Sequence, residues 1–335
     1  MTDADGTVHA THYRRWGGRL RGGWTWLPIA MSGIRQRFRD PRSVALLLGS
    51  VGLVIASWML FYILSLLEAL AETRDAPGIY IVINFFLGVN LGEVVGAGSY
   101  RLPLWLSLFV LLNKLQMFYL LVLIGWLGPG LIAGDLRSNA LPIYFARPIT
   151  PRTYLLGKWI TMALFIAIGT LLPNLLALAG GVLIAGGVPS WSEPLRLAGA
   201  LILSSGVVML CGGAVILALS SLSPDKRIVT ASWLAVALLP AMTRWAVRFE
   251  AGTGNAAGFL GSLSLGHNAL HLTEWLLGVR KVWQDTGLPV AVYEAALGST
   301  GDPLQPALVM LGVTILAFLV CYRRVVRFSR AAASL

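Results

Sequence analysis

The sequence predicts an all-α polytopic membrane protein with six transmembrane helices, and three observations lead to this fold class. Hydrophobic residues make up 56% of the 335 residues and charged residues only 12%, whereas an ordinary soluble domain carries about 25% charged residues. The apolar residues gather into long runs, several of which exceed the roughly 20 residues that a helix needs to cross a bilayer. Charged and Pro-broken stretches separate these runs, as expected where the chain returns to water.

The N-terminal segment, residues 1–43, has no apolar run long enough to span a membrane. Its first part, through Gly23, has the composition of a flexible basic tail. The following part mixes Trp and aliphatic residues with arginines, which is typical of a helix that lies on an anionic membrane face. Asp40-Pro41 ends this interfacial helix and begins the first span. We expect no cleavable signal peptide, because the first apolar run begins late and is long.

Six apolar runs are interpreted as spans, and together with their connections they form a transmembrane domain over residues 44–322. The predicted spans are residues 44–67, 106–133, 154–185, 195–222, 228–247 and 304–322. Two longer connections, residues 68–105 and 248–303, lie on one side of the membrane in this scheme. Within the first connection, residues 79–98 are long enough to span but carry Asn84, Asn90 and Glu93, so we interpret them as a re-entrant or interfacial element.

Charge asymmetry orients the six-span scheme. The net charge of +11 would also suit a nucleic-acid-binding protein, but most of the 26 basic residues fall on one side of the predicted membrane. That side holds the N-terminal segment, the connection between spans two and three, the 223–227 turn and the basic tail at 323–335. The positive-inside rule places these segments in the cytoplasm of a bacterial or archaeal cell, and no nucleic acid is needed to explain the charge.

Lys114 is the charged residue that stands out inside a predicted span. About 28 Å of helix separates it from Ala133, so it is expected near the outer interface. One interpretation is an anchor whose long side chain reaches the interface beside Asn113 and Gln116. The alternative is a cation that contacts a substrate.

Catalytic motifs are missing from the sequence, so we expect no enzyme activity and no cofactor in this chain. No GxxxxGK followed by Ser or Thr is present, and neither are the GxSxG or HExxH patterns. His267, His271 and Glu274 share one face of a predicted helix and form a weak candidate metal site. The competing interpretation is an amphipathic helix that rests on the outer membrane surface with its polar side in water.

The connection between spans two and three carries the most specific pattern in the chain. It contains an acidic residue, a Leu-x-x-x-x-x-Arg-Pro element, a second Arg and a closing Leu-Gly-Lys. The residues are Asp135, Leu141, Pro142, Ile143, Tyr144, Phe145, Ala146, Arg147, Pro148, Ile149, Arg152, Tyr154, Leu156, Gly157 and Lys158. This stretch resembles the same connection in permeases of the type-2 ABC exporter family, and the six spans with an interfacial elbow helix before the first are similar too.

The resemblance implies a permease that works as a dimer with two copies of a separate ABC ATPase subunit, which binds the ATP and Mg²⁺. It also implies that the 134–153 loop forms a cytoplasmic coupling helix seated in a cleft of the ATPase, and it leaves room for a periplasmic accessory protein. The residues assigned to coupling by match to the motif are Asp135, Arg137, Leu141, Tyr144, Phe145, Arg147, Pro148, Arg152 and Lys158. The competing interpretation is that the basic residues among them only flank helix ends on the cytoplasmic side.

Two other function classes remain open from the sequence alone. A secondary transporter would need coupling charges near the membrane midplane, and apart from Lys114 the predicted spans carry almost none. A membrane scaffold or sensor would look nearly the same in sequence. The leading interpretation is therefore an ATP-driven exporter permease of the cytoplasmic membrane, surrounded by lipid.

Overall fold

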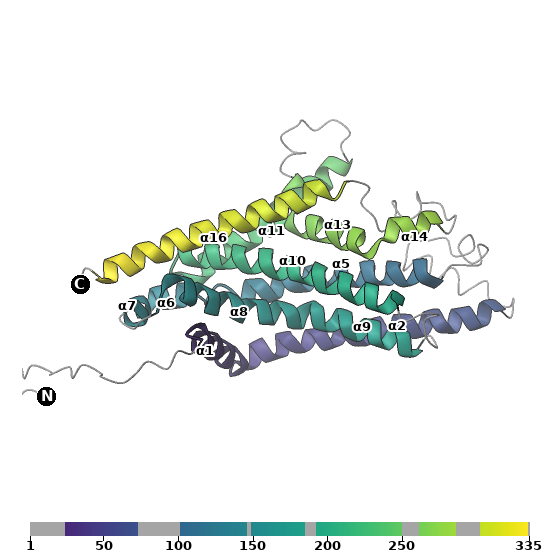
Figure 1. The fold of residues 1–335 in the computed structure, drawn as a ribbon, viewed down its shortest axis with the longest axis horizontal. Coiled ribbons are helices and arrows are strands. Elements are labelled where there is room, and N and C mark those ends of the chain that lie inside the picture. The colour runs from purple at the N-terminus through teal and green to yellow at the C-terminus, as the bar shows by residue number, and fades with distance from the viewer. Residues whose placement is uncertain are drawn as a thin grey trace, which may run out of the picture.

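A computed structural model describes residues 24–72, 101–145, 149–184, 192–249, 261–285 and 302–333 of the chain. All regular secondary structure in these ranges is helical, which confirms the predicted all-α class. Figure 1 shows long helices packed lengthwise into an elongated bundle. The predicted basic tail through Gly23 and the 79–98 element lie outside the described residues.

Five helical stretches of the described chain are long and apolar enough to cross a membrane. They are Pro41–Ile63, Leu102–Leu127, Pro151–Ile184, Ser192–Leu222 and Leu304–Ser329. They belong to α2 (Pro41–Glu72), α5 (Arg101–Leu127), the consecutive α8 (Pro151–Gly169) and α9 (Leu171–Ile184), α10 (Ser192–Leu222) and α16 (Leu304–Ala333). Each of the five overlaps one of the predicted spans, so the structure supports a multi-pass membrane protein.

The predicted fifth span, 228–247, lies inside helix α11 (Lys226–Phe249). This helix is not among the five stretches that length and composition identify in the described chain, and its apolar run contains Pro240 and Arg244. Two contacts align α11 with α5: Trp233 Nε1 donates to the Leu121 carbonyl at 2.9 Å, and Thr230 Oγ1 donates to the Gly125 carbonyl at 3.2 Å. The six-span count therefore stays a prediction, and α11 is the helix that decides it.

A short break separates α8 from α9 where the sequence predicts a kink at Pro173-Asn174. The ring of Pro173 removes the backbone donor that would bond the Gly169 carbonyl, so the helix cannot continue unchanged through this turn. Thr170 marks the break, and its hydroxyl donates to the Ile166 carbonyl at 2.9 Å. Buried amides then hold α9 against α5: Gln116 Nε2 donates to Asn174 Oδ1 at 3.0 Å, and Asn174 Nδ2 donates to Asn113 Oδ1 at 3.3 Å.

Helix α1 (Trp26–Phe38) forms where the interfacial helix is predicted, and it packs across α8. The crossing is close, because a Cβ placed on Gly157 would lie 2.8 Å from the Ile29 Cβ and 2.9 Å from the Trp26 carbonyl oxygen. Thr161 of α8 donates to the Ala30 carbonyl at 3.3 Å. Ile29 and Ala30 are accordingly buried, while Trp24, just before α1, and Phe38, its last residue, remain exposed.

Two short helices, α6 (Ala133–Arg137) and α7 (Ala140–Phe145), fill the connection between α5 and α8. They lie at the same end of the bundle as α1 and the C-terminal end of α16 (Figure 1). The opposite end carries α14 (Val279–Asp285), which follows α13 (Leu265–Leu277). The bundle therefore has one end built from the segments that the sequence assigns to the cytoplasm.

Candidate functional site

The turn that follows α5 is fixed to α10 by one buried hydroxyl. Ser220 Oγ accepts hydrogen bonds from the backbone N–H groups of Ile132 and Ala133, at 3.0 and 2.9 Å, and donates to the Pro129 carbonyl at 2.8 Å. The Ser220 side chain is fully buried. Because the start of α6 leaves backbone donors without helical partners, this hydroxyl replaces the missing bonds and ties the connection to a long helix.

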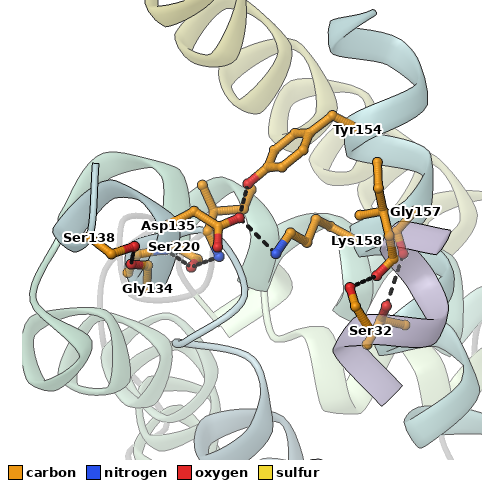
Figure 2. A network of polar contacts seen from close by, with 12 residues as sticks. Ser32, Gly134, Asp135, Ser138, Tyr154, Gly157, Lys158 and Ser220 are labelled. Carbon is orange, nitrogen blue, oxygen red and sulfur yellow. Dashed lines mark hydrogen bonds and ion pairs between the residues drawn. The ribbon is translucent and has the colours of Figure 1, made fainter. Parts of the chain in front are cut away.

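Asp135 and Lys158 form an ion pair that joins α6 to α8. Lys158 Nζ lies 2.7 Å from Asp135 Oδ2, and the hydroxyl of Tyr154 donates to the same oxygen at 2.6 Å (Figure 2). Only 9% of the Lys158 side chain and 16% of the Asp135 side chain are exposed. A carboxylate that is this enclosed is held by two partners on one helix, so α6 is set at a fixed position relative to α8.

Aromatic rings complete the joint on the α7 side. The Tyr144 and Tyr154 ring centroids are 5.5 Å apart, and those of Phe145 and Tyr154 are 5.9 Å apart. The Lys158 ammonium lies 5.5 Å from the Tyr154 ring centroid and 6.0 Å from that of Tyr144. Ring packing and cation–π contacts of this kind add stability where water is excluded. Leu141, 3% exposed, anchors α7 in the same core.

The residues assigned to coupling therefore separate into two groups. Asp135, Leu141 and Lys158 face inward and hold the connection together. Tyr144 and Phe145 are half-buried against Tyr154. Arg137 and Arg152 face outward, and so do two further residues of the same connection, Pro142 and Ile143, of which Ile143 is 66% exposed. Arg147 and Pro148 lie outside the described residues. The outward group combines two guanidinium groups with an apolar side chain, which is the composition of a protein-binding surface.

A second basic group borders this connection. A Cβ placed on Gly130 would lie 2.7 Å from Arg37 Nη2 and 3.4 Å from Lys226 Nζ, so α1 and α11 bring two cations to one turn. Burial lowers the pKa of Arg37, and the negative charge of Asp40 opposes this shift. Sequence reasoning did not connect these residues, because they are far apart in the chain.

Lys114 lines a cavity of about 400 Å³ between α5, α10, α11 and α13. Its walls are mainly aliphatic and aromatic, and Arg244 and His267 contribute the other basic side chains. Arg244 was missed by the sequence analysis, although a signal for it existed. An arginine within an apolar run of spanning length is a functional candidate by itself, because a charge in hydrocarbon requires a specific environment.

The candidate metal ligands share a helix face as predicted. His267 and His271 have ring centroids 6.0 Å apart on α13, and Glu274 is buried. However, no group of three or more His, Cys, Asp or Glu side chains in the described part of the chain is arranged to hold a metal ion. Asn268, Thr273 and Glu274 of α13 are buried, so these polar side chains lie inside the bundle, whereas the amphipathic interpretation expected the polar side of this helix in water.

The all-helical bundle, its five candidate spans and its braced connection define a multi-pass membrane protein. A family model described as ABC-2 family transporter protein matches residues 114–333, more than half of the chain, and the protein belongs to this family of ABC transporter permeases. A comparison with curated proteins finds no match. Membership makes the chain a transport component of the membrane and implies an ABC ATPase as its partner.

Proposed function

We propose that the chain is the permease subunit of an ATP-driven exporter and that the α6–α7 pair transmits motion from the ATPase to the spans. One observation carries this proposal: the pair is braced on two long helices and still presents an exposed surface. Ser220 fixes it to α10, and the Asp135–Lys158 ion pair fixes it to α8. A rigid joint of this kind passes a displacement on, whereas a loose loop would absorb it.

The exposed surface has the chemistry to bind another protein. Arg137 and Arg152 supply guanidinium groups that pair with carboxylates in a two-pronged geometry. Ile143 lies between the acidic turn of α6 and the start of α8 in sequence and offers an apolar contact that a partner would bury. The proposed partner surface is therefore a cleft that combines an apolar centre with acidic groups at its edge.

The transport cycle that we propose is supported by the permease family and by the bracing of α6. Two copies of the chain face each other, and two ATPase subunits bind ATP and Mg²⁺ beneath them in the cytoplasm. Closure of the ATPases displaces α6 and α7, and α8 and α10 move with them because of the ion pair and the Ser220 bonds. The permeases then change between states that differ in access to the outer side. The populations of these states depend on how much more tightly the ATPases bind one state than the other.

The function is tested by recovery of the tagged chain from its native membrane in mild detergent, followed by mass spectrometry and an ATPase assay. We expect a soluble ATPase in stoichiometric amount, and ATP hydrolysis that responds to the permease. The double substitution R137E/R152E should lower both by about tenfold or more, because two guanidinium contacts become repulsive.

The matched control is K281E, which reverses an exposed charge on α14 at the opposite end of the bundle. It should leave ATPase recovery unchanged. Equal recovery of the ATPase with wild-type chain and R137E/R152E would remove the α6–α7 surface from the mechanism. Recovery of the chain alone in several detergents would exclude an ATP-driven function.

A further inference from the structure

Two basic side chains from different helices meet at the turn between α5 and α6. A Cβ placed on Gly130 would lie 2.7 Å from Arg37 Nη2 of α1 and 3.4 Å from Lys226 Nζ of α11. Because both distances are measured from one point, the two nitrogens lie within about 6 Å of each other, where two positive charges repel strongly outside bulk water. Arg37 and Lys226, with Gly130 between them, are here called the Arg37–Lys226 pair.

The carboxylates near the Arg37–Lys226 pair are bonded elsewhere. The structure shows neither nitrogen in an ion pair with a carboxylate of the described residues. The negative charge of Asp40 acts on Arg37, but both Asp40 oxygens accept hydrogen bonds at the start of α2. Asp225 accepts from the Arg227 N–H at 2.9 Å, at the start of α11. The other basic residues close to the pair in sequence are Arg35, Arg39, Arg42 and Arg227.

The Arg37–Lys226 pair lies at the level where several helices meet the membrane surface. Arg37 is the second-last residue of α1, just before the spanning helix α2 begins, and Lys226 is the first residue of α11. Gly130 follows the end of the spanning helix α5. Exposed apolar side chains are found at the same level, on three different helices: Phe38, Trp126 and Ile228. Positive charge beside exposed apolar surface is typical of the region that lipid head groups occupy.

We propose that the Arg37–Lys226 pair binds the phosphate group of an anionic phospholipid in the cytoplasmic leaflet. One phosphate offers oxygens to the guanidinium fork of Arg37 and to the ammonium of Lys226, and its charge cancels their repulsion. Gly130 has no side chain in the space between the two cations, so a phosphate can reach both. The hydrocarbon chains of the lipid cover the exposed apolar side chains at this level.

A phosphate held by this pair joins α1 and α11 across the turn that precedes α6. The Pro129 carbonyl, next to Gly130, accepts a hydrogen bond from Ser220 of α10 at 2.8 Å. The lipid is therefore a further attachment of the same turn, and the stability of this end of the bundle should depend on anionic lipid. This dependence does not rest on the proposed transport function.

Other ligands that carry a phosphate fit the Arg37–Lys226 pair less well. A zwitterionic phospholipid has the same phosphate, but it also brings a cation into a region that already has an excess of arginines. A free phosphate ion, or a head group without its chains, gains nothing from the apolar surface at this level.

The binding site is tested with the full chain in nanodiscs of phosphatidylcholine. The probe is phosphatidylglycerol with a photoactivatable diazirine in its head group, and the labelled residues are mapped by mass spectrometry. We expect labels in three segments that are remote in sequence, residues 35–42, 126–133 and 223–230. Labelling confined to other segments would overturn the proposal.

Competition separates the possible sources of the phosphate without any substitution. Phosphatidylglycerol without the diazirine should suppress the labelling of the three segments. Inorganic phosphate and glycerophosphoglycerol, which is the same head group without chains, should not suppress it. Suppression by glycerophosphoglycerol at the concentration that is effective for the lipid would show a site for a soluble anion, and would reject the lipid.

Two neighbouring variants test whether the position of the charge is important. K226Q should weaken labelling by phosphatidylglycerol about tenfold or more, because it removes a hydrogen bond between charged groups. R227Q is the matched control, since it removes an equal and exposed charge one residue further along α11. It should weaken labelling clearly less than K226Q does. Equal losses in the two variants would show that only net charge attracts the lipid, and would overturn the site.

Thermal unfolding of K226Q should change in opposite directions in the two lipids. In phosphatidylcholine, K226Q should unfold at the wild-type temperature or above it, because the repulsion with Arg37 is relieved. In phosphatidylglycerol it should unfold below the wild type, because the bound lipid has lost one partner. An equal decrease in both lipids would assign Lys226 a structural role without lipid. None of these readouts requires an ATPase, so failure of the lipid site and failure of ATPase coupling are separate results.

Discussion

At the scale of single residues, the ion pair between Asp135 and Lys158 should be important for the stability of the fold, because both charges are largely buried. Replacing Lys158 with Met leaves the Asp135 carboxylate, only 16% exposed, with the Tyr154 hydroxyl as its remaining described partner. We expect a loss of about 3 kcal/mol in the free energy of unfolding, because removing one partner leaves a buried charge uncompensated. Thermal unfolding of the purified chain in detergent measures this change.

The control for the ion pair is E193Q, which removes the partner of Arg196 on the surface. This pair is 3.2 Å long and its side chains are 43% and 38% exposed, so its loss should change the free energy of unfolding by less than about 1 kcal/mol. The double variant D135N/K158M should recover part of the loss of K158M, since the buried charge is then gone. Strict additivity of D135N and K158M would contradict the coupling.

Asp40, the residue before α2, should make the stability of the fold depend on pH. The Ser43 hydroxyl donates to Asp40 Oδ2 at 2.7 Å and the Arg42 N–H to Oδ1 at 3.2 Å. The Ser43 hydrogen bond is the largest cause that lowers the pKa of Asp40. This carboxylate therefore stabilises the fold above the pKa of the unfolded chain, and that contribution is lost as the pH falls through the lower, folded pKa.

The variant S43A tests the pH dependence of Asp40. Unfolding temperatures measured between pH 7 and pH 3 should fall less steeply for S43A than for the wild type, because the donor that lowers the pKa is removed. S57A is the matched control, since the Ser57 hydroxyl donates to the Val54 carbonyl of its own helix and touches no carboxylate. A wild-type slope in S43A would show that this hydrogen bond does not set the pKa.

At the scale of elements, S220A should destabilise the protein more than S221A, the same substitution at the next residue. S220A leaves the N–H groups of Ile132 and Ala133 without an acceptor in a buried turn, which costs about 1 to 3 kcal/mol for each group that water cannot reach. The Ser221 hydroxyl donates to the Ala218 carbonyl of its own helix α10, and this bond does not involve the α6 turn, so S221A should have a smaller effect. Loss of ATPase stimulation in S220A, with the chain still inserted, would support the bracing of α6.

The crossing of α1 and α8 supplies a second test of elements. G157A places a Cβ 2.8 Å from the Ile29 Cβ and 2.9 Å from the backbone oxygen of Trp26, and a backbone atom cannot yield without moving α1. We expect faster trypsin cleavage at the arginines of α1 and a lower unfolding temperature. G130A is the control, because the atoms nearest to its new Cβ are the flexible ends of Arg37 and Lys226. Equal protease sensitivity of the two variants would contradict the close crossing.

The sequence could predict the helices but not the contacts between them. Long apolar runs determine the candidate spans because bilayer thickness sets the length of a helix, so the five stretches follow from composition alone. The Asp135–Lys158 pair and the Ser220 bonds depend on how remote segments meet: Ser220 is 88 residues from Ile132. Lys114 was identified as a solitary cation, whereas its relation to Arg244 requires the register of α5 against α11.

At the scale of the whole molecule, α11 determines on which side of the membrane the C-terminus lies. α10 ends beside the α6 turn through Ser220, while α16 returns to the same end of the bundle from the other end (Figure 1). The chain must therefore travel between the two ends after Leu222, and α11 runs antiparallel to α5 along this path. Its Arg244 is compatible with a crossing because it lines the cavity between α5, α10, α11 and α13 instead of facing hydrocarbon alone.

Cysteine labelling of whole cells and inverted vesicles tests the crossing of α11. In a background with both buried cysteines, Cys211 and Cys321, replaced by serine, we expect S223C and S329C to react from the cytoplasmic side and D285C from the outer side. Without a crossing by α11, D285C stays on the side of the 223–227 turn, and α16 then places S329C on the other side, so the two reactivities are exchanged. Reaction of S223C and S329C from opposite sides would therefore reject the six-span scheme, and with it the positive-inside argument that places the basic C-terminal end in the cytoplasm.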